Sequence, residues 1–80
     1  MKKVTIVYFA VLREQRGLSR EELHTDAATF GDLYDELSTR FGLTLPRSLV
    51  RASANDAFCE MADPVEEGAV VVFIPPVAGG

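Results

Sequence analysis

Hydrophobic and polar positions alternate in blocks that predict a sheet of four to five strands and one main helix. Val4–Leu12 is rich in β-branched and aromatic residues, which predicts the first strand. Both faces of this strand are largely apolar, so it is expected in the middle of the sheet, with Lys3 and Thr5 on its wetter face. On that face Val7 and Phe9 form an apolar patch, which would mark a partner site unless the protein's own loops cover Phe9.

The segment after this strand is polar and weakly patterned. Residues 13–17 end in Gly17 and predict a turn or a single helical turn. Ser19–Thr25 has Leu23 as its only large apolar residue, which predicts a short edge strand paired with the first. His24 stands there among acidic residues and is expected to be a solvated surface side chain.

The main helix is expected to begin after Thr29, a candidate N-cap, with Asp32 in its first turn and Gly42 just past its end. Glu36 and Arg40 are four residues apart in the favourable order for an ion pair. One apolar stripe follows the helical period: Phe30, Leu33, Tyr34, Leu37 and Phe41. A helix with a single apolar face is expected to pack on one face of a sheet.

The second half of the chain predicts three more strands. Leu49–Ala54 and Phe58–Met61 read as short strands, and Asp63–Gly68 as a turn that ends in a glycine. Ala69–Ile74 is apolar on both faces and is expected to be central, like the first strand. Two central strands from opposite ends of the chain predict parallel pairing between them, in an α+β fold of order strand-strand-helix-strand-strand-strand.

Length and composition limit what this fold can be. Eighty residues, 48% of them hydrophobic, make one domain, expected over residues 1–74, with residues 75–80 as a flexible tail. The net charge of −4 disfavours nucleic acid and anionic membranes as partners and favours a partner with a basic groove. The N-terminal apolar run is too short to span a bilayer and has no cleavage signal, so a cytoplasmic protein is expected. A single cysteine, Cys59 beside Glu60, predicts a structural thiol and no disulfide, and with one histidine it predicts no metal site.

The end of the chain carries the strongest chemical signal. Pro75 and Pro76 stop strand pairing and stiffen the chain, while Gly79 and Gly80 leave the terminal carboxylate without side chains around it. The six residues after Ile74 can reach roughly 20 Å from the fold. Such an end can enter another protein's narrow active site.

These features together resemble a known family. The Tyr8-Phe9-Ala10 segment, the Gly68 turn and the Phe73–Gly80 end make the whole chain similar to the small subunits of molybdopterin synthase, which are ubiquitin-like sulfur carriers with a β-grasp fold. The resemblance implies a chain with no active site and no bound cofactor. An ATP-dependent activating enzyme would adenylate Gly80 and convert it to a thiocarboxylate, a C-terminal 1-thioglycine. The large subunit, in a heterotetramer, would then use this sulfur to build molybdopterin from a cyclic pyranopterin monophosphate.

The resemblance also implies which residues meet the partners. Phe9, Phe58 and Ile74 would dock on the activating enzyme and the large subunit, although Ile74 stands where the family more often has an aromatic residue. The tail would thread into the partner through Pro75, Pro76, Val77, Ala78, Gly79 and Gly80. Two alternatives share the Gly-Gly end: a sulfur carrier for thiamine synthesis, tRNA thiolation or cysteine synthesis, and a protein modifier that forms isopeptide bonds.

Overall fold

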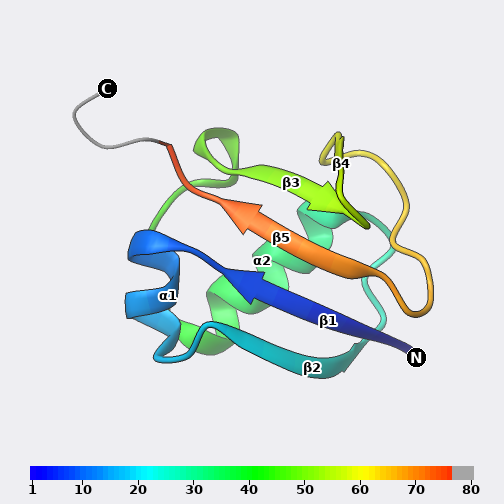
Figure 1. The fold of residues 1–80 in the computed structure, drawn as a ribbon, viewed down its shortest axis with the longest axis horizontal. Coiled ribbons are helices and arrows are strands. Elements are labelled where there is room, and N and C mark those ends of the chain that lie inside the picture. Colours follow the sequence, from blue (N-terminus) through cyan, green and yellow to red (C-terminus); the bar gives the residue numbers. More distant parts are fainter. Residues whose placement is uncertain (77–80) are drawn as a thin grey trace.

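A five-stranded mixed sheet of order β2-β1-β5-β3-β4 forms the centre of the protein (Figure 1). The computed structural model describes residues 1–76. The elements in chain order are β1 (Lys2–Tyr8), α1 (Ala10–Arg16), β2 (Arg20–Thr25), α2 (Phe30–Phe41), the 3-10 helix η1 (Arg47–Leu49), β3 (Arg51–Ala54), β4 (Ala57–Cys59) and β5 (Val70–Ile74).

The two apolar strands from opposite ends of the chain pair in parallel at the middle of the sheet, which confirms the predicted topology. Their register places Thr5 opposite Val70 and Tyr8 opposite Phe73. β2 pairs antiparallel with β1 at one edge, and β3 pairs antiparallel with β5 on the other side. This is the β-grasp architecture implied by the resemblance of the sequence.

Helix α2 covers one face of the sheet and has the predicted ends (Figure 1). The Thr29 side chain accepts a hydrogen bond from the backbone N–H of Asp32, and Gly42 ends the helix with φ of 72°. Its buried stripe packs on the inward side chains of the central strands, with Tyr34 and Phe73 in edge-to-face contact at 5.3 Å between ring centroids. The core consists mainly of Val4, Ile6, Tyr8, Leu12, Phe30, Leu33, Leu37, Val71 and Phe73.

The prediction of a strand over Val4–Leu12 is wrong at its C-terminal end. β1 stops at Tyr8, and residues 10–16 form a short helix, α1, where the sequence predicted the end of the strand and a turn or a single helical turn. The chain turns at Ala10, which has φ of 50°, and the helix ends at Gly17, whose backbone N–H donates to the Arg13 carbonyl. Leu12 lies on α1, and its side chain is fully buried in the core to which β1 also contributes. This burial accounts for its apolar character.

A partly buried polar cluster holds α1 against the sheet. The Arg16 guanidinium donates two hydrogen bonds to the Glu21 carboxylate, at 2.7 and 2.9 Å. The Tyr8 hydroxyl donates to the same carboxylate at 2.7 Å. The Arg16 guanidinium also lies 3.7 Å from the centre of the Phe41 ring, a cation–π contact. The Arg16–Glu21 ion pair joins α1 to β2. Its contacts with Tyr8 and Phe41 extend this link to β1 and to the end of α2.

The remaining predicted strands are shorter in the structure. Leu49 belongs to η1, so β3 begins at Arg51, and β4 ends at Cys59 because the Glu60 N–H turns away to the Asp63 carboxylate at 2.9 Å. The predicted turn glycine, Gly68, has φ of 82°. Within residues 1–76, no helix is long and apolar enough to cross a membrane.

Candidate functional site

The sheet face opposite α2 carries a row of apolar side chains across its central strands. The register aligns Val7 with Val72, Val72 with Ser53, and Ser53 with Phe58. Side chains in register on adjacent strands point to the same face. Val7 and Val72 are partly exposed, and the Phe58 side chain is 69% exposed. This open face is an apolar surface on a small domain, as expected of a protein-binding site.

A second row of side chains on this face lies where the chain leaves the sheet. Arg51 is in register with Ile74, and Phe9 follows the Tyr8–Phe73 pair. Phe9 is 48% exposed, so the alternative that the protein's own loops cover it is wrong for the described chain. The Arg51 guanidinium lies 5.1 Å from the centre of the Phe58 ring, which links the two rows. The structure thus brings Phe9 and Ile74 together where the chain leaves the sheet, with Phe58 further along the same face.

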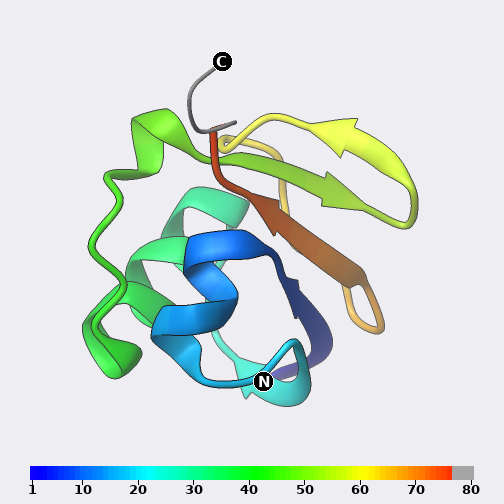
Figure 2. The same cartoon turned by 60° about the vertical axis from the view of Figure 1, so that its left-hand side comes forward.

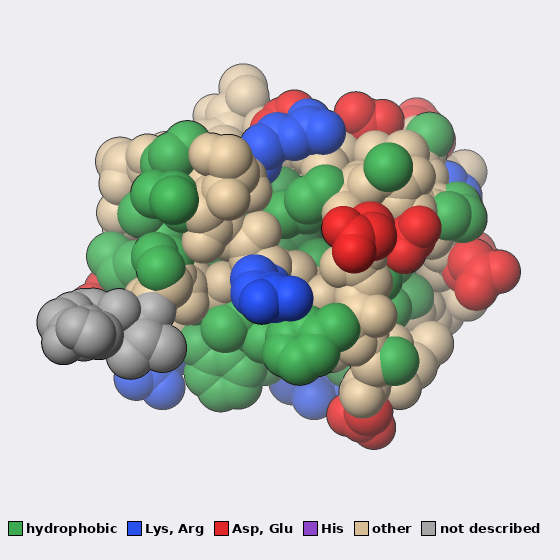
Figure 3. Space-filling model, turned by 90° about the horizontal axis from the view of Figure 1, so that it is seen from above, with side chains coloured by type: hydrophobic (Ala, Val, Ile, Leu, Met, Phe, Trp, Pro, Cys, Tyr) green, Lys and Arg blue, Asp and Glu red, His purple; other side chains and the backbone are tan. Residues whose placement is uncertain are grey.

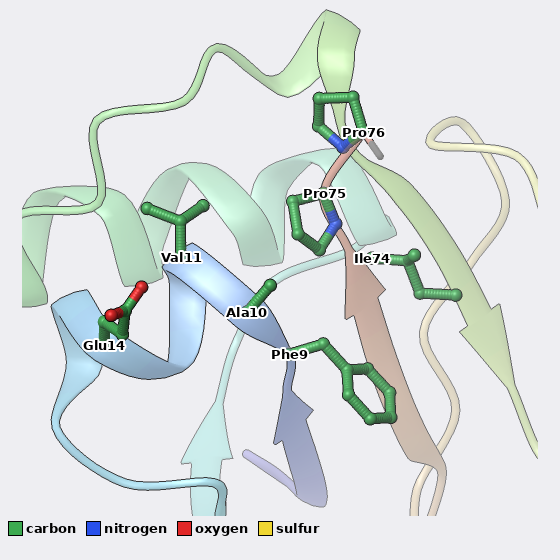
Figure 4. Close-up of a pocket in the computed structure, with 7 residues that line it drawn as sticks. All are labelled: Phe9, Ala10, Val11, Glu14, Ile74, Pro75 and Pro76. Carbon is green, nitrogen blue, oxygen red and sulfur yellow. The ribbon is translucent and has the colours of Figure 1, made fainter. Parts of the chain in front are cut away.

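Two grooves flank the tail root, which we define as Ile74, Pro75 and Pro76. The first, the α1 groove, has a volume of about 470 Å³ (Figure 4). Its other wall consists of Phe9, Ala10, Val11 and Glu14. Figures 1 and 2 show α1 and the end of β5 at the same end of the molecule.

The second groove, the β3 groove, lies on the other side of the tail root and has a volume of about 560 Å³. Leu49, Arg51 and Glu60 line it together with Ser48. Pro75 is buried between the two grooves, and Pro76 is exposed. Four predicted site residues, Val77, Ala78, Gly79 and Gly80, lie outside the described residues.

Three residues of this surface were missed by the sequence interpretation. Val11 and Leu49 are 36% and 50% exposed, and Glu14 lines the α1 groove. Val11 was assigned to a strand and Glu14 to a turn or a single helical turn, whereas α1 places both on the groove wall. The sequence signal that could have revealed α1 is Gly17 directly after a turn that contains Arg13 and Arg16. Basic residues followed by a glycine are typical of helix C-termini.

Charges are distributed unevenly around this surface. Figure 3 shows large groups of hydrophobic side chains at the left and along the lower middle of the face seen from above, and most acidic side chains in the right half. Among residues 1–76, no three His, Cys, Asp or Glu side chains form a metal-binding group. Burial and the nearby Asp63 and Glu60 carboxylates raise the pKa of the Cys59 thiol, so Cys59 is not an activated nucleophile. The arrangement is suited to binding another protein beside the end of the chain.

Comparisons with known proteins agree with this geometry. The ThiS family model matches residues 6–80. The molybdopterin synthase sulfur carrier subunit of Escherichia coli (strain K12) is 30% identical over 80 residues, covering 96% of this chain and 99% of that protein.

Two solved structures show the same fold. Small archaeal modifier protein 1 of Haloferax volcanii has a TM-score of 0.80 at 18% identity, covering 96% of this chain and 100% of that chain. A chain in the complex of subunits 1 and 2 of the molybdopterin-converting factor from Helicobacter pylori 26695 has a TM-score of 0.65 at 22% identity, covering 98% and 99%. With a family match over nearly its full length and a relative of the same size, this chain belongs to the ThiS family of ubiquitin-like sulfur carriers.

Proposed function

We propose that this chain is the sulfur carrier subunit of a molybdopterin synthase and carries sulfur as a thiocarboxylate on Gly80. The observation that carries the proposal is the position of Phe9 and Ile74, which place an open apolar surface beside the point where the chain leaves the sheet. A partner bound to that surface would receive the end of the chain directly. The E. coli relative with this role matches 96% of the chain, which supports this pathway over other sulfur-carrier pathways.

The chemistry begins with activation of the terminal carboxylate. A carboxylate oxygen of Gly80 attacks the α-phosphorus of ATP, and pyrophosphate leaves. A sulfide equivalent then attacks the carbonyl carbon of this acyl-adenylate, and AMP leaves with the bonding electrons. The products are AMP and a terminal thiocarboxylate in which sulfur has replaced one oxygen. Its sulfur is the nucleophile that would attack the cyclic pyranopterin monophosphate.

Both steps need catalytic groups from other proteins. The ATP-dependent activating enzyme would bind ATP and exclude water from the adenylate, and the large subunit would bind the pterin. The proposed contacts are Phe9 and Phe58 on the open face and Ile74 at the tail root, with Pro76 directing the chain into the partner. The complex of the two H. pylori subunits supports a partner of this kind, and we propose a heterotetramer of two small and two large subunits.

Intact-mass measurement tests the carrier chemistry. The purified chain is incubated with ATP, the activating enzyme of its own organism and inorganic sulfide. We expect a mass shift equal to one oxygen-for-sulfur exchange, which is absent without ATP and absent in a variant lacking Gly80. An unchanged mass with active enzyme would contradict the carrier function.

A second assay tests the pathway. The thiocarboxylated chain is mixed with the large subunit and cyclic pyranopterin monophosphate, and molybdopterin is measured by fluorescence after oxidation. Molybdopterin formation with loss of sulfur from the chain is the expected result. A stable thiocarboxylate that yields no molybdopterin would assign the chain to another sulfur pathway. Reductant-resistant conjugates larger than 8.7 kDa in cell extract would instead indicate a protein modifier.

A further inference from the structure

The α1 groove adjoins the open sheet face and has one charged residue in an apolar lining. Apolar side chains line both of its walls, and among the described residues that line it Glu14 is the only charged one (Figure 4). Val11 and Glu14 are one helical turn apart, so they occupy the same side of α1. The opposite wall is the tail root. An occupant of this groove would therefore contact the chain immediately before its end.

Contacts outside the groove fix the position of both of its walls. Gln15 exchanges two hydrogen bonds with Thr44, at 2.7 and 3.1 Å, and Arg16 is bound to Glu21. These contacts fix α1 on the side away from the groove. The other wall is fixed by Pro75, which is buried. A groove with both walls fixed costs little ordering entropy when it is filled.

Glu14 sets the sign of charge that the groove accepts. Its carboxylate forms no ion pair with any residue in the range 1–76. Docking of an apolar group next to it removes water from the carboxylate, which is unfavourable unless the partner supplies a donor or a cation. The β3 groove gives no such preference, because Arg51 and Glu60 both line it.

We propose that the α1 groove binds one bulky apolar side chain of the large subunit, and that a Lys or Arg beside that side chain pairs with Glu14. This inference rests on the proposed function and specifies its partner. The apolar side chain would bury Phe9, Val11 and Pro76, and the cation would fix its register along α1. Because Ile74, Pro75 and Pro76 form one wall, the same contact would set how far the chain end enters the large subunit.

Calorimetric titration of the unmodified chain with its purified large subunit tests this inference. Glu14→Gln keeps the shape of the side chain and removes its charge. We expect binding about 5- to 10-fold weaker at low ionic strength, with a smaller dependence of the dissociation constant on salt. Glu14→Lys is expected to bind still more weakly. Val11→Ala, which removes apolar area from the same wall, is expected to weaken binding at every ionic strength.

Glu66→Gln is the matched control, because it makes the same charge change on an exposed turn residue before β5, at the other end of that strand. It is expected to bind within about twofold of the unmodified chain. Equal dissociation constants and salt dependence for Glu14→Gln and Glu66→Gln would overturn the inference while leaving the proposed function intact. Failure of the unmodified chain to bind the large subunit would overturn both.

Discussion

The Tyr8 hydroxyl and the Glu21 carboxylate lie 2.7 Å apart, joined by a hydrogen bond between the central strand β1 and the edge strand β2. Arg16 of α1 binds the same carboxylate, and the Arg16 and Glu21 side chains are 21% and 16% exposed. The Glu21 carboxylate thus helps to fix the helix that carries one wall of the α1 groove. This cluster makes the stability of the fold sensitive to one position on an edge strand.

Glu21→Gln is expected to lower the free energy of unfolding by about 1–3 kcal/mol, because Arg16 and Tyr8 lose a charged acceptor at a partly buried site. The neighbouring Glu22→Gln is the control. Glu22 pairs with Lys3 at 3.5 Å on the surface, where the two side chains are 63% and 56% exposed, so a loss below about 1 kcal/mol is expected. Urea unfolding measures both, and equal losses would contradict a special role of Glu21.

The stability should also depend on acid pH through Glu21. The hydrogen bond from Arg16 is the main cause that lowers the pKa of the Glu21 carboxyl below 4.5, and Tyr8 adds to it. The unfolded chain therefore takes up a proton at Glu21 at a higher pH than the folded protein does. The stabilisation is present at pH values above 4.5, the ordinary pKa of a glutamate, and is lost as the pH falls through the lower folded pKa.

This pH dependence can be isolated by comparison with Glu21→Gln. The difference in unfolding free energy between the unmodified chain and the variant should be constant near neutral pH and shrink in the acid range. Urea unfolding as a function of pH measures it. A difference that stays constant to acid pH would show that the charge of Glu21 does not contribute.

Ala10 is expected to be unusually sensitive to branching at Cβ. It is exposed and has φ of 50°, in the left-handed region, which costs a non-glycine residue about 1–2 kcal/mol. Ala10→Gly should leave the stability unchanged or raise it by up to about 1 kcal/mol, because relief of strain is offset by a more flexible unfolded chain. Ala10→Val should lower it by about 1–3 kcal/mol.

The control for Ala10 is Ala62→Val, since Ala62 is also exposed and does not have a positive φ. The Val substitution there should change the stability by less than about 0.5 kcal/mol. Thermal unfolding of the four chains provides the comparison. The same effect of Val at both positions would argue against strain at Ala10.

Phe9→Asp and Phe58→Asp are each expected to weaken binding of the large subunit by about tenfold or more, because a charge replaces an exposed aromatic side chain on the proposed docking surface. His24→Asp tests specificity, because His24 is exposed on β2 opposite Lys3, away from the tail root. It should bind nearly as well as the unmodified chain. Unchanged binding in both Phe variants would exclude the open face as the docking surface.

Much of the fold could be predicted because its signals are local. Thr29 and Gly42 mark the ends of α2 by their own chemistry, and both caps are found as predicted. The parallel pairing of β1 and β5 followed from their shared apolar character. The start of helix α1 was missed because Ala10, Val11 and Leu12 continue the apolar run of β1 without a break, and only Gly17 marks the end of the helix.

The site was predictable where it depended on single exposed residues and unpredictable where it depended on packing. Phe9 and Ile74 were expected at the docking surface, and the structure places them beside each other at the tail root. Glu14 and Leu49 became visible only through the short helices that carry them. Pro75 is buried between residues from distant parts of the chain, which line the two grooves. No local sequence pattern therefore predicts its burial.

The parallel pairing of β1 with β5 also has a consequence during synthesis. β5 is a central strand, and without it β1 and β3 have no partner between them. The two halves of the sheet therefore cannot join until Val70–Ile74 has left the ribosome, since contacts between distant parts of a chain form late. A chain interrupted before this strand would remain unfolded and open to proteolysis. Only completed molecules would then offer partners both the docking surface and the residues that follow it.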